Sequence, residues 1–295
     1  MRRRSHSGGR RLLGGLLVVL LGLGVAVAVD WMTVGNLRSW LARMGVPGPY
    51  LGLGSRVDIG GRSLYLDCRG SGTPTVVLEA GMGTGTSTWS EVHDRLARIA
   101  RTCAYDRAGL GRSDPRGVHT FAESASDLAN LLRAAGEPAP YVLVAHSLGG
   151  AYARVFAAGR PDEVAGLVMV DTFDPDLQDD WIHPLLGPVR AEYEAELDGL
   201  RDLVARVDSL DWPASEGELR AATDLGVPIE FIFAARFEPR LDEHTNQLIV
   251  QAWIDARESL SPGRARHTTA VGAGHFVHLE RPDLVVDAVA RMLAP

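Results

Sequence analysis

A serine in the middle of the chain and a histidine near its end are the residues whose surroundings best suit chemistry. Ser147 lies in the segment VLVAHSLGG at residues 142–150. An apolar run followed at once by small residues predicts a buried strand that turns sharply into a helix, and such a turn lifts a serine hydroxyl above a parallel sheet. The usual pattern is G-x-S-x-G. Ala145 stands at the first glycine, where its small side chain still lets the helix approach the strand.

A serine hydroxyl is a weak nucleophile until a neighbouring base removes its proton. His275 follows the flexible Gly-Ala-Gly turn at residues 272–274, which suits an imidazole projected back over a sheet. We therefore predict Ser147 as the nucleophile and His275 as the base that later protonates the leaving group. His278 is expected to pack at the start of a helix. The alternative is a His-x-x-His metal pair with His275, which lacks a third ligand cluster.

An acidic residue must hold the imidazole in the correct tautomer and stabilise the imidazolium as it forms. The favoured candidate is Asp171, which ends an apolar segment and would lie beside the strand that carries Ser147. Asp171 could equally cap the segment that follows it. The alternatives are Glu238, Asp174 and Asp242, and geometry rather than sequence decides among them.

Hydrophobic periodicity predicts the elements that must position these residues. Gly60 and Gly61 are the predicted turn of a hairpin at residues 56–67. Strands are expected at residues 76–78, 102–105, 141–145, 165–170, 228–233 and 266–271, and helices at 90–99, 121–135, 148–158, 189–207 and 283–293. Strands that alternate with helices imply a parallel sheet with helices on both faces.

Two further motifs extend the pattern. The segments TVVLEAGMG at residues 75–83 and CAYDRAGLGRS at 103–113 resemble the third and fourth strands of the α/β-hydrolases, with the loops that follow them. The chain order of serine, acid and histidine is also that of this family. Over residues 56–295 the chain is similar to bacterial α/β-hydrolase fold serine hydrolases with an N-terminal membrane segment. The resemblance implies an α/β fold with a mostly parallel eight-stranded sheet, helices on both faces and a helical cap insertion at about residues 172–227.

The resemblance also assigns roles near the serine. The backbone N–H groups of Met82 and Leu148 would form the oxyanion hole. Four residues of the segment at 103–113 would support the loop that carries Met82 and would not react themselves: Asp106, Arg107, Gly109 and Gly111. The glycine-rich run at residues 81–85 lacks the G-x-G-x-x-G spacing of a dinucleotide site.

Composition excludes several classes of protein. With 295 residues and 46% hydrophobic content, the chain can bury one large core. All thirty basic residues are arginine, so neither a Schiff-base lysine nor a P-loop lysine is available. The net charge is −7, and five arginines among the first eleven residues leave −12 on the remainder. An acidic body argues against nucleic-acid binding.

The N-terminus is predicted to direct the protein to or across a membrane. Residues 12–29 are uncharged and apolar, a length at the lower edge of a spanning helix and above that of a typical signal sequence. The preceding arginines should stay in the cytoplasm. Residues 26–28 also fit an A-x-A cleavage site, so a removed signal peptide is the alternative. We expect an anchor or signal at residues 1–30, a connector at 31–55, and a domain that is either membrane-anchored and extracytoplasmic or secreted.

The two cysteines admit two interpretations. Cys68 ends the second expected strand and Cys103 begins the fourth, and the resemblance makes these strands antiparallel neighbours. A disulfide would suit an oxidising compartment. Alternatively, both are small buried hydrophobic residues.

Together these features imply a serine hydrolase that needs no cofactor and cleaves a neutral small-molecule ester, as a carboxylesterase or lipase-like enzyme does. The acidic body disfavours anionic substrates. Three alternatives stay open: an amide, peptide or C–C bond hydrolase that uses the same machinery, a non-catalytic ligand receptor on the same fold, and a lipid-handling scaffold. An aspartate nucleophile is disfavoured, because Ser147 fills that position. The oligomeric state stays unknown.

Overall fold

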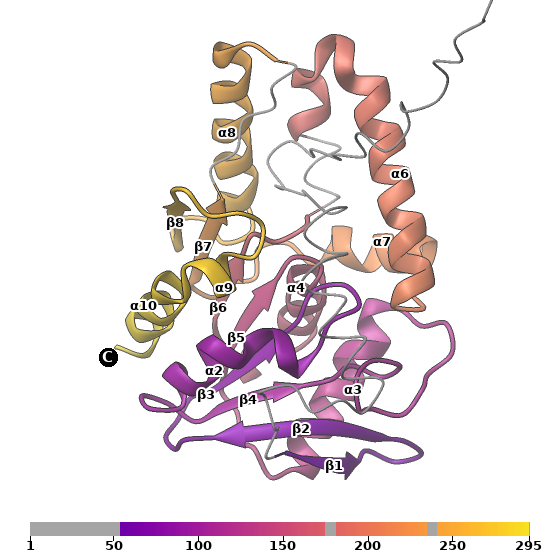
Figure 1. Ribbon diagram of the computed structural model, residues 1–295, viewed down its shortest axis with the longest axis vertical. Helices are drawn as coiled ribbons and strands as arrows, with labels where there is room; N and C mark the ends of the chain where they lie inside the picture. The colour runs from indigo at the N-terminus through magenta and orange to yellow at the C-terminus, as the bar shows by residue number, and fades with distance from the viewer. Residues whose placement is uncertain (1–53, 175–180, 235–240, 295) are drawn as a thin grey trace, which may run out of the picture.

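Eight strands form one sheet in the computed structural model, which describes residues 54–174, 181–234 and 241–294 (Figure 1). Their order across the sheet is β1-β2-β4-β3-β5-β6-β7-β8. β2 pairs antiparallel with β1 and β4, and every other pair is parallel. The strands are β1 (Ser55–Asp58), β2 (Ser63–Arg69), β3 (Thr75–Glu79), β4 (Thr102–Tyr105), β5 (Tyr141–His146), β6 (Val164–Val170), β7 (Ile229–Ala234) and β8 (Ala265–Ala270).

The central strands are buried on both faces, because apolar side chains point alternately to either side of the sheet. In β5, Leu143 belongs to one hydrophobic cluster and Val144 to the other. Such continuous apolar runs are typical of parallel strands covered by helices on both faces. The first cluster includes the buried hydrophobic residues of α3 (Phe121–Ala134) and α4 (Gly149–Gly159); the second includes those of α2 (Ser90–Leu96) and α10 (Pro282–Leu293).

The predicted elements agree with the structure within a few residues at their ends. The hairpin at residues 56–67 is β1 and β2, and Gly60 and Gly61 both have positive φ in its turn. The predicted eight-stranded, mostly parallel sheet with helices on both faces is confirmed. Shorter helical segments complete the loops: η2 (Thr86–Trp89), η3 (Pro161–Glu163) and α9 (Val277–Glu280).

A helical insertion separates β6 from β7. Its elements are η5 (His183–Leu185), η6 (Gly187–Val189), α6 (Arg190–Val207) and α7 (Trp212–Ala221). In Figure 1, α6 rises beyond the sheet on the right of the view, and α8 (Glu243–Glu258) rises on the left. The helix expected at residues 189–207 is thus present. Whether the insertion acts as a cap stays a prediction.

Helix α8 was not among the elements expected from the sequence, although its pattern carries the signal. Ile249, Trp253 and Ala256 recur at helical spacing and are buried. Asp242 caps the first turn, since its side chain accepts a hydrogen bond from the N–H of Thr245. The cap and the apolar residues at helical spacing together specify this helix.

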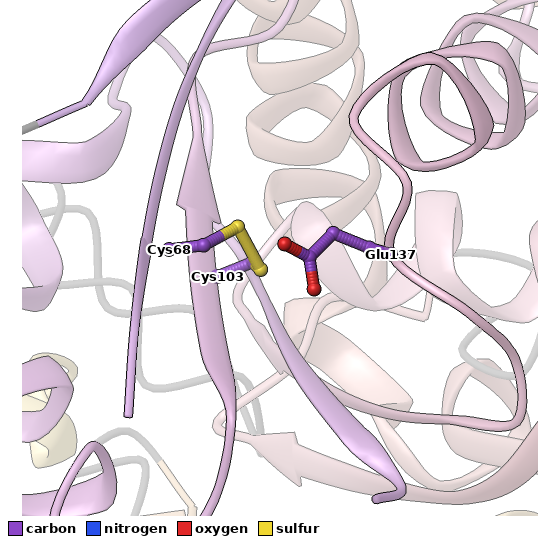
Figure 2. Close-up of side chains that lie close together, drawn as sticks. All are labelled: Cys68, Cys103 and Glu137. Carbon is purple, nitrogen blue, oxygen red and sulfur yellow. A yellow bond between two sulfur atoms is a disulfide. The ribbon is translucent and has the colours of Figure 1, made fainter. Parts of the chain in front are cut away.

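Cys68 and Cys103 form a disulfide between neighbouring strands (Figure 2). They face each other directly in the antiparallel register of β2 and β4. Of the two interpretations left open by the sequence, the structure therefore has the disulfide. The carboxylate of Glu137 lies beside the two sulfurs.

The predicted anchor or signal at residues 12–29 and most of the connector lie outside the described residues. Among the residues that are described, no helix has the length and apolar character needed to cross a membrane.

Candidate active site

Ser147 occupies a sharp turn between β5 and α4. Its φ of 51° is in the left-handed region, which is costly for a residue with a Cβ. Neighbouring bonds hold it there: its N–H donates to the carbonyl of Val170, and its own carbonyl accepts from Gly150 and Phe173. This is the strand–turn–helix geometry that the sequence predicts for an exposed nucleophile.

The glycines after Ser147 allow the helix to approach its neighbours. A Cβ on Gly149 would lie 2.6 Å from the carbonyl oxygen of Glu79, and one on Gly150 would lie 2.6 Å from the side chain of Thr172. Ala145 is fully buried in β5 between its partners in β3 and β6. Small residues therefore stand where close approach requires them.

Asp171 follows β6 directly and is also held in the left-handed region, with a φ of 44°. Its N–H donates to the carbonyl of Ile232, and its Oδ1 accepts from the N–H of Ala234 at 2.9 Å. The other oxygen, Oδ2, lies 2.7 Å from Nδ1 of His275. The carboxylate is 1% exposed, so water competes little for this hydrogen bond.

His275 lies in the loop between β8 and α9, with its side chain only 10% exposed. Because a carboxylate accepts the hydrogen bond at Nδ1, that nitrogen carries the proton and Nε2 is left as the basic position. The structure thus brings His275 together with Asp171 among the predicted acids.

The other candidate acids are placed elsewhere. Asp174 is fully buried, accepts a hydrogen bond from the hydroxyl of Thr172 and pairs with the guanidinium of Arg154. Asp242 is engaged as the cap of α8. Glu238 lies outside the described residues.

Ser147 and His275 line one cavity of about 530 Å³, counting the part open to solvent. Its other walls come from the loop after β3, from the end of β5 and the turn that leads into α4, from the segment after β6, from α6 and from the loop before α9. They consist of Gly81, Met82, Thr84, His146, Leu148, Phe173, Leu200, Val204 and Phe276. The lining is mainly apolar, with the serine and histidine as its polar groups of interest.

Met82 and Leu148, whose N–H groups are predicted to form the oxyanion hole, line the same cavity as Ser147. Leu148 precedes α4, whose N-terminal end carries the positive end of the helix dipole. A Cβ on Gly81 would lie 3.3 Å from Cβ of Ser147, so the loop that carries Met82 passes directly against Ser147. Within the described residues, neither N–H donates a hydrogen bond to another group.

The loop after β4 is hydrogen-bonded to the loop that carries Met82, and its role in bracing an oxyanion hole stays a prediction. The carboxylate of Asp106 accepts hydrogen bonds from the N–H groups of Thr86 and Arg112. Burial raises the pKa of Asp106, while these two N–H donors oppose the rise. Arg107 donates to the carbonyls of Ala80, at 2.5 Å, and Gly81, at 2.8 Å.

Two buried histidines, His146 and His278, lie beside the site. The sequence assigns no role to His146 and predicts that His278 packs at the start of a helix. Nε2 of His146 lies 2.9 Å from the carbonyl oxygen of His275, to which it donates. His278 packs against His146, with ring centroids 4.2 Å apart and ring planes tilted by 51°, and its Nε2 contacts the hydroxyl of Thr88. Burial lowers the pKa of His278 to about 3 and that of His146 well below its ordinary value. Because His146 directly precedes Ser147 in the sequence, its place beside the site could have been predicted.

Among the described residues, one group of side chains has the spacing of metal ligands: Cys68, Cys103 and Glu137 (Figure 2). The two sulfurs are bonded to each other, and a metal would need them as free thiolates. In the described part of the chain, His275 and His278 do not belong to any group of three potential metal ligands.

The sheet order, with an antiparallel second strand and a serine on the turn after β5, is the arrangement of one fold family. The profile of the alpha/beta hydrolase fold matches residues 74–216. The chain has the α/β-hydrolase fold.

Solved α/β-hydrolase structures resemble the chain over most of its length. A candidate lipase from Acinetobacter baumannii has a TM-score of 0.60 and 17% sequence identity, and the match covers 90% of this chain and 96% of the lipase. The epoxide hydrolase CorEH has a TM-score of 0.56 and 21% identity, over 82% of this chain and 98% of that protein. At these identities the likeness shows the fold alone.

Sequence relatives match a shorter part. A candidate carbamate hydrolase, RutD of Azorhizobium caulinodans, is 36% identical over 113 residues, which are 38% of this chain and 42% of that protein. The chain spans about half or less of the length of the first curated relatives that it matches.

Proposed function

We propose that this α/β-hydrolase is a serine hydrolase that cleaves a neutral carboxylic ester through an acyl-enzyme on Ser147. One observation carries the proposal: His275 is hydrogen-bonded to the buried Asp171 and lines the same apolar cavity as Ser147. An imidazole oriented by a carboxylate, in the same cavity as a serine on a strained turn, is what nucleophilic catalysis of acyl transfer requires.

In the first half-reaction, Oγ of Ser147 attacks the ester carbonyl while Nε2 of His275 takes the hydroxyl proton. Asp171 stabilises the imidazolium that forms. The N–H groups of Met82 and Leu148 stabilise the negative oxygen of the tetrahedral intermediate. The imidazolium then gives its proton to the departing alcohol, which leaves Ser147 acylated.

In the second half-reaction, His275 takes a proton from water, whose oxygen attacks the acyl carbon. The second tetrahedral intermediate uses the same two N–H donors. His275 returns the proton to Oγ of Ser147 as the carboxylic acid departs. No redox or metal step is needed.

The cavity wall supports an apolar, uncharged acyl group as the substrate. Apart from the two histidines, its side chains carry no titratable group in the described part of the chain, and Phe173, Leu200 and Val204 supply apolar contact area. A charged acyl group would be desolvated there without a partner. This lining supports an uncharged acyl group as the substrate.

A fluorophosphonate probe and a panel of p-nitrophenyl esters of increasing acyl length test the proposal. Wild-type protein should be labelled and should hydrolyse the esters, whereas Ser147→Ala should lose labelling and about 10⁶-fold in turnover. Ser126→Ala is the matched control, because Ser126 is an exposed serine on α3. A wild-type protein that neither reacts with the probe nor cleaves any ester would instead support a non-catalytic receptor.

A further inference from the structure

A carboxylate from the insertion between β6 and β7 reaches the loop that carries Met82. Asp208 is the C-terminal capping residue of α6, and its side chain is 1% exposed. Its Oδ1 accepts a hydrogen bond from the N–H of Gly83 at 2.7 Å, and its Oδ2 lies 2.6 Å from the guanidinium of Arg107. The insertion therefore contacts the residue that directly follows Met82.

Arg107 extends this contact to the other side of the same loop. Its guanidinium donates to the carbonyls of Ala80 and Gly81 and pairs with Oε1 of Glu79 at 2.6 Å. The loop backbone is thus held at three points, two carbonyls by Arg107 and one N–H by Asp208. Gly83 itself has a φ of +63°, a conformation that glycine adopts without strain.

These hydrogen bonds determine the direction of the Met82 N–H. The carbonyl of Gly81 and the N–H of Met82 belong to one peptide group, which is planar and trans, so they point in opposite directions. Fixing the Gly81 carbonyl toward Arg107 therefore fixes the Met82 N–H away from Arg107. The bond from Gly83 to Asp208 restrains the next peptide group along the chain.

The positive charge of Arg107, which holds the loop, is stabilised by its neighbours. Burial opposes the charge of Arg107, but the carboxylates of Asp208 and Glu79 outweigh it and raise the pKa of the guanidinium well above its ordinary value. The guanidinium also lies 4.5 Å from the ring centre of Tyr152. Fixed, water-excluded charges of this kind need no rearrangement during a reaction.

Helix α6 has a second contact with the site. Val204 and Leu200, about one and two turns before Asp208, line the cavity beside Ser147. The same helix therefore forms part of the wall against the acyl group and holds the loop that presents the Met82 N–H. A shift of α6 would disturb both at once.

We propose that Asp208 is a positioning residue through which helix α6 orients the Met82 N–H for the oxyanion, so that the oxyanion hole is complete only with α6 in place. The inference rests on the proposed function and names a regulation of that same site. It makes the insertion part of the catalytic geometry.

Kinetics of Asp208→Asn and Asp208→Ala test the inference. The asparagine can still accept from Gly83 but offers Arg107 no charge, and the alanine removes both contacts. We expect kcat for a p-nitrophenyl ester to fall about 10-fold in the first variant and about 10²–10³-fold in the second, with KM little changed, because one oxyanion donor is misdirected. Rates are expressed per site titrated with the fluorophosphonate, so unfolded molecules do not count.

The control variant is Asp211→Ala, which removes the N-terminal cap of α7 three residues away. It should lower the melting temperature but leave kcat per titrated site at the wild-type value. A merely structural role for Asp208 predicts the same behaviour in the Asp208 variants. Wild-type kcat in Asp208→Ala would therefore overturn the inference.

A boronic acid gives a second readout, because its tetrahedral adduct on Ser147 resembles the intermediate. Its affinity should fall in parallel with kcat across the two Asp208 variants and stay unchanged in Asp211→Ala. Equal affinity in all four proteins would contradict an orienting role.

Amide hydrogen exchange separates failure of this inference from failure of the proposed function, since it needs no activity. The peptide that covers residues 80–85 should exchange faster in Asp208→Ala than in wild type or Asp211→Ala, as the Gly83 N–H loses its acceptor. Unchanged exchange overturns the inference whatever the enzyme assays show. If Ser147→Ala retains full ester hydrolysis, the proposed function fails, whereas the exchange result still decides whether Asp208 restrains the loop.

Discussion

Nδ1 of His275 lies 2.7 Å from Oδ2 of Asp171, although 104 positions separate the two residues in the chain. The contact forms because Asp171 directly follows β6 and His275 follows β8, and β7 lies between these strands with all three parallel. The carboxyl ends of parallel strands meet at one edge of a sheet, where α/β proteins place their sites.

Replacing Asp171 by asparagine should abolish most activity without unfolding the protein. The amide can keep the bond from Ala234 but favours the wrong imidazole tautomer, so kcat should fall on the order of 10³–10⁴-fold. Steady-state kinetics at neutral pH measures this. Asp242→Asn and Glu238→Gln are the controls, and a comparable loss in Glu238→Gln with a mild effect in Asp171→Asn would reassign the acid.

Stability should fall as the pH drops below about 6.5, because His278 is buried with a pKa of about 3. The unfolded imidazole titrates near 6.5, so the unfolded state binds more protons between these two values. The stability is therefore fully present above pH 6.5 and is lost toward pH 3. For His278 alone the loss at pH 5 is about 2 kcal/mol.

Urea unfolding between pH 4 and 8 measures this dependence. The variant His278→Gln cannot titrate, so its free energy of unfolding should vary less steeply with pH than that of the wild type. Identical slopes for the two proteins would show that His278 is not the group responsible.

The glycine that follows the nucleophile turn should not tolerate a methyl group. In Gly149→Ala the new Cβ would lie 2.6 Å from a backbone oxygen of β3, so α4 or β3 must shift, at a cost of about 1–3 kcal/mol. Gly159→Ala, at the other end of α4, meets nothing within 4 Å and should be neutral or stabilising. Thermal unfolding compares the stabilities of the two variants. An equal effect on the melting temperature would argue against the close approach of α4 to β3.

A larger side chain at Leu200 should shorten the preferred acyl chain. Leu200 on α6 lines the cavity, so Leu200→Trp should lower kcat/KM for long-chain p-nitrophenyl esters about 10-fold or more relative to the acetate. The exposed Leu248 on α8 offers the matched control Leu248→Trp, which should leave the chain-length profile unchanged. A profile in Leu200→Trp that matches the wild type would place the acyl group elsewhere.

Deleting residues 1–30 should leave ester hydrolysis intact and change only where the protein is found. The apolar run at residues 12–29 is proposed to anchor or export the domain, so the truncated protein should lose its membrane or extracellular location. Cell fractionation with an activity assay measures both effects. Loss of activity in the truncated protein would favour the lipid-handling alternative.

The sequence by itself determined the periodicities and the turn chemistry. Alternating apolar strands and helices specify a covered parallel sheet, and small residues around Ser147 specify a sharp turn, because both depend on neighbours along the chain. Only the tertiary structure decided which acid meets His275, since Asp171 and Asp174 have the same chemistry and lie three residues apart. Likewise, nothing local linked Asp208 to Gly83 across 125 positions. Such contacts depend on strand order and helix placement, which no short segment encodes.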